Sequence, residues 1–161
     1  MNLTARDIMS HPVVSAREDM TVAELISLLR EKQISGVPVI DSSEDLVGVI
    51  SITDLLSISP DGLPRTDDEE SDFHSSPAMD GLAGASALLE PEGEALDLIV
   101  RDLMSPNLIS AGEGAPMGEL ADLMVTHRIH RLIIVEGRKA VGIVSVMDIL
   151  RTLRDQHRAE G

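Results

Sequence analysis

Two copies of one short motif hold the residues that are best able to bind a ligand. Gly, Ser and Asp stand at the first, fourth and seventh positions of residues 48–54 (GVISITD) and of residues 142–148 (GIVSVMD). Each copy is expected to end a strand and begin a helix, where backbone N–H groups attract an anion. A serine hydroxyl can donate a hydrogen bond to a phosphate there, and a carboxylate can accept from both hydroxyls of a ribose. The motif therefore indicates a nucleotide site.

The same residues also have a purely structural interpretation. Ser51 or Thr53 can cap the helix, and Asp54 is favourable in its first turn. Duplication does not separate the two interpretations, because a cap would be duplicated as well. Spacing alone leaves both open.

The elements that position these residues belong to an internal repeat. Residues 6–10 (RDIMS) recur as residues 101–105 (RDLMS), and the similarity continues through both motifs with one deletion. In each copy a short extended piece precedes an amphipathic helix, which starts at a Thr21/Glu24 capping box or with Pro116 as first helical residue. A hairpin and a second helix follow. The expected strands are 13–15, 37–40, 46–52, 108–110, 132–135 and 140–146, and the expected closing helices are 54–57 and 148–156.

This order predicts an α+β protein of two β-α-β-β-α repeats, at residues 1–58 and 100–157, with a tail at 158–161. One repeat alone would leave a face of its small sheet uncovered. The two are therefore expected to pack with pseudo-twofold symmetry and to form clefts between them, where small ligands tend to bind.

An acidic linker separates the repeats. Residues 59–99 hold eleven acids and one base, four prolines and the chain's only aromatic residue, Phe73. This is the composition of a linker, partly flexible or helical, with helix-forming stretches at 79–89 and 94–104. The acidic run 67–70 is either a solvated loop or a site for a divalent metal or a basic partner.

Composition excludes several classes of protein. The chain has 161 residues, a formal charge of −15, 43 % apolar residues and 1 % aromatic residues. The charge argues against nucleic acid or an anionic membrane as partner, and the core must be aliphatic. Without cysteine, there are no disulfides or thiol nucleophiles, and no cluster has the spacing of a zinc site. With no signal-peptide pattern and no long apolar run, we expect a cytoplasmic protein.

The repeats, the RDIMS segment, residues 36–41 (GVPVID) and the two Gly-x-x-Ser-x-x-Asp motifs resemble a pair of CBS domains, known as a Bateman module. The resemblance implies an adenosyl ligand, AMP, ADP or ATP first, with S-adenosylmethionine, NAD or a cyclic dinucleotide as further candidates. It implies that Asp54 and Asp148 hold the ribose and that Ser51 and Ser145 help hold phosphate. The base pocket it implies is aliphatic and lies around Ser10, Val14, Ile34, Val37, Ser105, Ile109, Ile129 and Leu132.

The copies differ in a charged segment. Residues 33–36 are Gln-Ile-Ser-Gly, whereas residues 128–131 are Arg-Ile-His-Arg. The resemblance suggests His130 and Arg131 as phosphate ligands. Alternatively, His127, Arg128, His130 and Arg131 form an exposed patch at a helix end. Ile133 also stands where the first copy has Pro38, so two unequal sites are expected.

The other histidines, His11, His74 and His157, lack ligand spacing and are expected at the surface. The methionines at apolar positions are expected in the core.

Together these features predict a regulatory module that binds an adenosyl ligand, needs no cofactor and catalyses nothing. A homodimer through the apolar faces of the short helices and an unidentified regulated protein are expected partners. The alternative is an interaction scaffold with vestigial nucleotide clefts, whose acidic linker recruits a basic partner. A small hydrolase using His130 with Asp54 or Asp148 is a third hypothesis, but no nucleophile or metal set completes its site.

Overall fold

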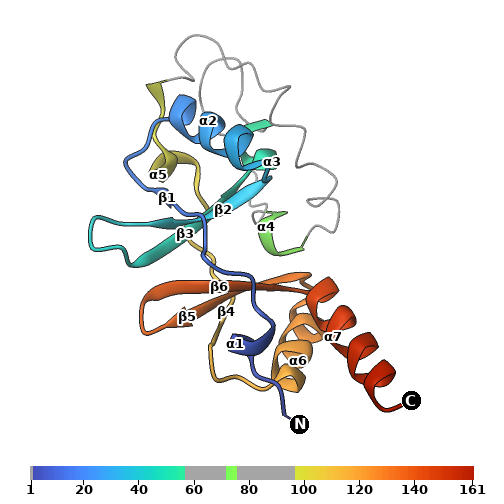
Figure 1. Cartoon of the computed structure of the whole chain (residues 1–161). Coiled ribbons are helices and arrows are strands. Elements are labelled where there is room, and N and C mark those ends of the chain that lie inside the picture. Colours follow the sequence, from blue (N-terminus) through green and yellow to red (C-terminus); the bar gives the residue numbers. More distant parts are fainter. Residues whose placement is uncertain (1, 57–71, 76–96) are drawn as a thin grey trace. The chain divides into compact units, whose positions relative to one another are not determined.

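The computed structural model describes residues 2–56, 72–75 and 97–161, which form two compact units (Figure 1). The N-repeat unit is Val14–Leu108, and the C-repeat unit combines Met1–Val13 with Ile109–Gly161. Residues 2–13 and 97–108 precede the first strand of each repeat, and we call them the lead-in segments.

Each unit contains a three-stranded sheet of the same topology. In the N-repeat unit the order along the chain is β1 (Ala16–Arg17), α2 (Val22–Lys32), β2 (Gly36–Ile40), β3 (Leu46–Ser51) and α3 (Ile52–Leu56). In the C-repeat unit it is β4 (Ser110–Gly112), α6 (Met117–His127), β5 (Arg131–Glu136), β6 (Lys139–Ser145) and α7 (Val146–Ala159). The first strand pairs parallel with the second, which pairs antiparallel with the third. The predicted β-α-β-β-α order is confirmed in both units.

Local capping explains where the long helices begin. The Thr21 hydroxyl accepts from the Glu24 N–H at 3.2 Å, and the Glu24 carboxylate accepts from the Thr21 N–H at 2.9 Å. Pro116 was expected to be the first helical residue of α6. It is instead the N-cap, and the helix begins at Met117. Because proline has no N–H, the hydrogen bond from the N-cap backbone to the side chain three residues later cannot form in α6.

Each core is a layer of helix on sheet. The apolar face of α2 packs on the inner face of β2 and β3, and α6 and α7 pack side by side on β5 and β6 (Figure 1). The buried side chains of α2 are Val22, Leu25, Ile26 and Leu29, and those of α6 are Leu120 and Met124.

The first copy has Pro38 where the second has Ile133, and the parallel strand pairing is one residue longer in the second copy. Both stand at the same register position, opposite Val49 and Ile143 respectively. The Ile133 N–H donates to the Ile109 C=O at 3.4 Å, a bond that proline cannot make. The parallel pairing accordingly spans two residues in β1 and three in β4.

The lead-in segments are exchanged between the repeats. Helix α1 (Ala5–Ile8) lies in the C-repeat unit, where the Ala5 N–H donates to the Ala115 C=O at 2.8 Å. Helix α5 (Val100–Leu103) lies in the N-repeat unit, where the Val100 N–H donates to the Met20 C=O at 2.8 Å. The compact units therefore do not share their boundaries with the sequence repeats.

Some expected elements differ from those found. The first strand of each repeat lies later than expected, at Ala16–Arg17 instead of 13–15 and at Ser110–Gly112 instead of 108–110. Helix α3 begins at Ile52 and α7 runs from Val146 to Ala159, so both start two residues earlier than expected, at the residue after the serine of each motif. Within the expected helix 94–104, residues 100–103 are helical, and 94–96 lie outside the described residues. The acidic run 67–70 and the expected helix 79–89 also lie outside them.

Candidate functional site

In the N-repeat unit, the Ser–Asp motif lies where β3 ends and α3 begins. Ser51 is fully buried, and its backbone N–H donates to Asp54 Oδ2 at 2.8 Å. Its hydroxyl donates to the same oxygen at 3.1 Å and lies 2.8 Å from Thr53 Oγ1. These bonds hold the half-buried Asp54 carboxylate at the start of the helix.

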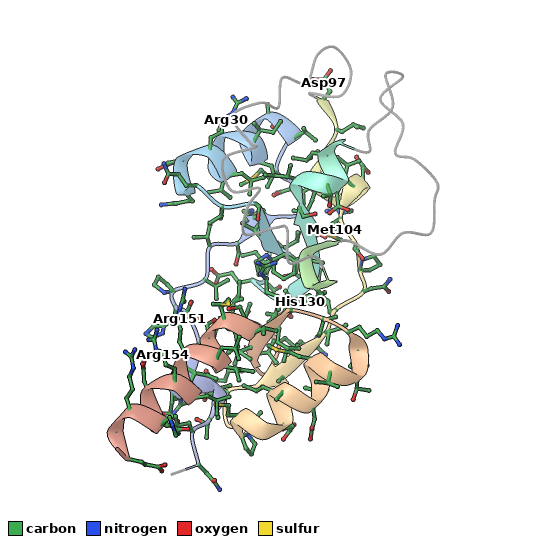
Figure 2. All side chains as sticks on the ribbon, turned by 90° about the vertical axis from the view of Figure 1, so that its right-hand side faces the viewer. Arg30, Asp97, Met104, His130, Arg151 and Arg154 are labelled. Atoms are coloured by element: carbon green, nitrogen blue, oxygen red, sulfur yellow. The ribbon has the colours of Figure 1, made fainter. Side chains whose placement is uncertain are left out.

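The motif of the C-repeat unit has the same arrangement. The Ser145 N–H and hydroxyl both donate to Asp148 Oδ2 at 2.8 Å, and the Asp148 N–H donates back to Ser145 Oγ at 3.2 Å. The second carboxylate oxygen, Oδ1, lies 3.6 Å from a nitrogen of Arg151. Arg151 and Arg154 extend from the outer side of α7 (Figure 2).

These hydrogen bonds are those of helix capping. Helix α7 has both bonds of a capping box, and α3 has the one that Asp54 accepts. In both units a single carboxylate oxygen, Oδ2, accepts the bonds from the serine. The structural interpretation therefore holds in full for α7, while the roles of these residues on a ligand stay a prediction.

The glycine of each motif has a role that the sequence did not reveal. A Cβ built on Gly48 would lie 2.8 Å from the Ser105 carbonyl oxygen and 2.8 Å from Met104 Sδ. A Cβ on Gly142 would lie 2.9 Å from the Cβ of Met9 and closer still to the rest of that side chain. Both glycines therefore allow a lead-in segment to cross a strand at close range.

The crossing is fixed by backbone hydrogen bonds. Ser10 pairs with Ile143 on β6 through bonds of 2.9 and 3.2 Å, and Ser105 pairs with Val49 on β3 through two bonds of 2.9 Å. Of the predicted base-pocket residues, Ser10 thus lies in the same unit as Ile109, Ile129 and Leu132. Ser105 lies with Val14, Ile34 and Val37.

The base-pocket residues differ in exposure. Val37, Ile129 and Leu132 are buried, and Val14, Ile34, Ser105 and Ile109 are half-buried. Ser10 is exposed. The described apolar members are all aliphatic, as the composition required.

Arg131 lies next to the motif of its unit. It is the first residue of β5 and stands directly opposite Ser145 on β6. Side chains at such opposed positions lie on one face of the sheet. His130 immediately precedes β5, and its C=O accepts from the first helical N–H of α7, that of Val146, at 3.0 Å.

A left-handed turn at Arg128 separates the charged residues of segment 127–131 into two pairs. His127 and Arg128 are exposed at the end of α6, where Arg128 adopts a left-handed conformation with φ 55°. His130 and Arg131 are half-buried beyond this turn. The four residues therefore do not form one exposed patch at the helix end.

Two expectations from the sequence are wrong. Met147, a methionine at an apolar position that was expected in the core, is 46 % exposed. His74 is 5 % exposed and Phe73 2 % exposed, whereas His74 was expected at the surface. Both lie in α4 (Asp72–Ser75), beside β3 (Figure 1). The reason is packing: the Phe73 ring lies against Gly36, where a Cβ would approach its Cδ2 to 3.0 Å. The signal in the sequence was a lone aromatic residue inside an acidic segment.

Across residues 2–56, 72–75 and 97–161, no three His, Asp or Glu side chains are grouped closely enough to hold a metal ion. The same part of the chain contains no helix with the length and apolar character needed to cross a membrane.

Comparison with known proteins decides the family. The CBS domain model matches the chain twice, at residues 5–61 and 100–155. The chain belongs to the CBS-domain family. An uncharacterised protein of Methanocaldococcus jannaschii, MJ1426, is 31 % identical over 154 residues, which cover 92 % of this chain and 89 % of the relative. The chain spans only 22 % to 55 % of seven other curated relatives.

Solved CBS pairs have the same fold. The structure of CBSX2 in complex with AMP matches with a TM-score of 0.66 and 24 % identity, covering 96 % of this chain and 98 % of that one. The CBS pair of MJ0100, in complex with 5′-methylthioadenosine and S-adenosyl-L-methionine, matches with a TM-score of 0.63 and 21 % identity, covering 97 % and 99 %. These CBS pairs thus bind adenosyl compounds.

Proposed function

We propose that this CBS pair is a non-catalytic regulatory module that binds an adenosyl nucleotide, with AMP, ADP or ATP as the ligand. The observation that carries the proposal is the junction of β5, β6 and α7 in the C-repeat unit. There Arg131 stands opposite Ser145, and Asp148 follows within the first turn of the helix. A cation, a hydroxyl and a carboxylate thus meet at one strand–helix junction.

Each group suits one part of a nucleotide. Arg131 suits the phosphate, because the planar guanidinium group of arginine is a cation that binds phosphate oxygens in a fork. Half-buried His130 is its neighbour. The Asp148 oxygen that the capping bonds do not use, Oδ1, is an acceptor for ribose hydroxyls. Half-buried Ile109 offers apolar surface for the base, whereas Ile129 and Leu132 are buried in the core behind it.

The relatives support the choice of ligand class. CBSX2 binds AMP, and MJ0100 binds two further adenosyl compounds. The occupied state can regulate a partner only if the ligand binds one conformation more tightly than another. S-adenosylmethionine and NAD are the alternative ligands, and they are titrated beside AMP, ADP and ATP for comparison.

Calorimetric titration tests the proposal. We expect AMP, ADP or ATP to bind, and Arg131→Ala to weaken that binding about 10- to 100-fold, because a charge-assisted hydrogen bond contributes roughly 1.5–3 kcal/mol. Arg154→Ala is the matched control, since Arg154 lies on the exposed side of α7 beside Asp155 at 2.8 Å. Adenosine should bind Arg131→Ala and the wild type equally. No heat and no change in melting with any of the five compounds at millimolar concentration would refute the proposal.

We also propose a homodimer that uses the outer face of α7. Met147, Leu150 and Leu153 are 46 %, 51 % and 47 % exposed and recur every third residue along the helix. Exposed apolar residues in such a row are typical of a protein interface. Leu150→Glu should convert a dimer to a monomer in sedimentation equilibrium, whereas Asp155→Lys, on the polar side of the same helix where the side chain is 62 % exposed, should not. A monomeric wild type would refute this.

A further inference from the structure

The chain's only aromatic side chain lies beside the Ser–Asp motif of the N-repeat unit. Phe73 is 2 % exposed, although it belongs to an acidic segment. A Cβ on Gly36 would lie 3.0 Å from Phe73 Cδ2 and 3.3 Å from Ser51 Cβ. The ring therefore reaches the sheet position that borders Ser51.

The same position is occupied differently in the C-repeat unit. In the strand register, Gly36 stands opposite Ser51, and Arg131 stands opposite Ser145. The space into which the Arg131 side chain begins to extend thus corresponds to the space that the Phe73 ring fills. His74, 5 % exposed, packs edge-on against the same ring, with the ring centroids 5.1 Å apart. One motif has an arginine opposite its serine, and the other has a glycine there with a buried phenyl ring against it.

We propose that Phe73 determines which motif binds nucleotide: it closes the Ser51–Asp54 motif, so that each chain takes one nucleotide, at Ser145 and Asp148. The inference rests on the proposed function and adds the number and place of the ligands. A nucleotide at Ser51 would need the space of the ring, and expulsion of the ring would expose a buried apolar surface. No cation replaces Arg131 at position 36, so the phosphate would gain less there.

Titration with AMP tests the assignment of the site. We expect one AMP per wild-type chain, weakened about 10- to 100-fold by Arg131→Ala and unchanged in Asp54→Asn. Phe73→Ala should admit a second AMP, which Asp54→Asn then removes. Phe73→Leu, which keeps an apolar side chain in place, should bind one AMP. Two AMP per wild-type chain, or one that Asp54→Asn abolishes, would overturn the inference while leaving nucleotide binding intact.

The two proposals fail separately. If the wild type binds none of AMP, ADP, ATP, S-adenosylmethionine and NAD, the proposed function fails. The closure by Phe73 then stands only if Phe73→Ala binds one AMP, and it fails if that variant binds none.

A spectroscopic measurement keeps the test independent of the folding of Phe73→Ala. Because the chain has a single Phe and neither Tyr nor Trp, uniform labelling with 4-fluorophenylalanine gives one ¹⁹F resonance. We expect no shift of this resonance between H₂O and D₂O, with or without AMP. A solvent isotope shift in the protein without AMP would show an exposed ring and overturn the inference.

Discussion

Replacing Gly48 or Gly142 with alanine places a methyl group where a lead-in segment crosses a strand. At Gly48 the obstacle includes the backbone oxygen of Ser105 at 2.8 Å, and at Gly142 it includes the Cβ of Met9 at 2.9 Å. Neither atom can move aside by a side-chain rotation alone. The lead-in segment itself must shift, and its paired hydrogen bonds to the strand must lengthen.

The cost follows from overpacking. Forcing extra volume into a packed site costs about 1–3 kcal/mol, which lowers the melting temperature of a chain of this size by roughly 2–4 °C for each kcal/mol. Differential scanning calorimetry of both variants should therefore show falls of roughly 2–12 °C. Amide hydrogen exchange should show faster exchange at Val49 and Ser105 in Gly48→Ala than in the wild type.

The chain supplies a matched control for the substitution itself. Gly118 lies in the first turn of α6, and a Cβ built on it meets nothing within 4 Å. Gly118→Ala should stabilise the protein, by about 0.5–1 kcal/mol, because alanine loses less backbone entropy on folding than glycine. If Gly48→Ala and Gly142→Ala were as stable as Gly118→Ala, the crossing would not require glycine and the reasoning would be refuted.

Two further results are expected. The backbone N–H of Thr4 and, with a smaller effect, its hydroxyl donate hydrogen bonds to the Asp7 carboxylate, and they lower the pKa of that carboxyl below the usual 3.8. The contribution of Asp7 to the stability of the fold is therefore complete above the unfolded-state pKa. It is lost as the pH falls through the lower folded-state pKa. Melting temperatures between pH 6 and pH 2 should fall less steeply in Asp7→Asn than in the wild type, and parallel curves would contradict this. Since the chain has no cysteine, the exchange of lead-in segments can be tested by oxidation: Val49→Cys with Ser105→Cys should form an intramolecular disulfide, whereas a disulfide between Val49→Cys and Ser10→Cys would contradict the exchange.

Local rules account for what the sequence predicted correctly. The strands of each hairpin were found within one residue, because two runs rich in β-branched apolar residues flank a polar turn in both copies. Helix α2 begins where Thr21 and Glu24 form their reciprocal bonds, and those bonds need no contact from elsewhere in the chain.

The candidate site could be predicted only in part, because one set of groups serves two purposes. A serine and an aspartate three residues apart cap a helix, and the same pair suits a phosphate and a ribose. The structure shows that Asp148 uses Oδ2 for the cap, whereas Oδ1 lies beside Arg151. A pattern of residue types does not show which oxygen of a carboxylate makes the capping bonds and which one is left for another partner.

The exchange of the lead-in segments could not be predicted at all, and the reason lies in the repeat itself. Arg6 forms an ion pair with Glu113, and Arg101 forms one with Glu18 at 3.0 Å. Glu18 and Glu113 occupy equivalent positions, so either arginine would find an acceptor of the same type in either unit. Near-identity makes the exchanged and unexchanged pairings equivalent in residue chemistry, and only the path of the chain distinguishes them. Gly36 and Arg131 differ between the copies at the register position opposite the serine of each motif. The proposal that Phe73 separates the binding properties of the two motifs rests on this difference and not on the shared residues.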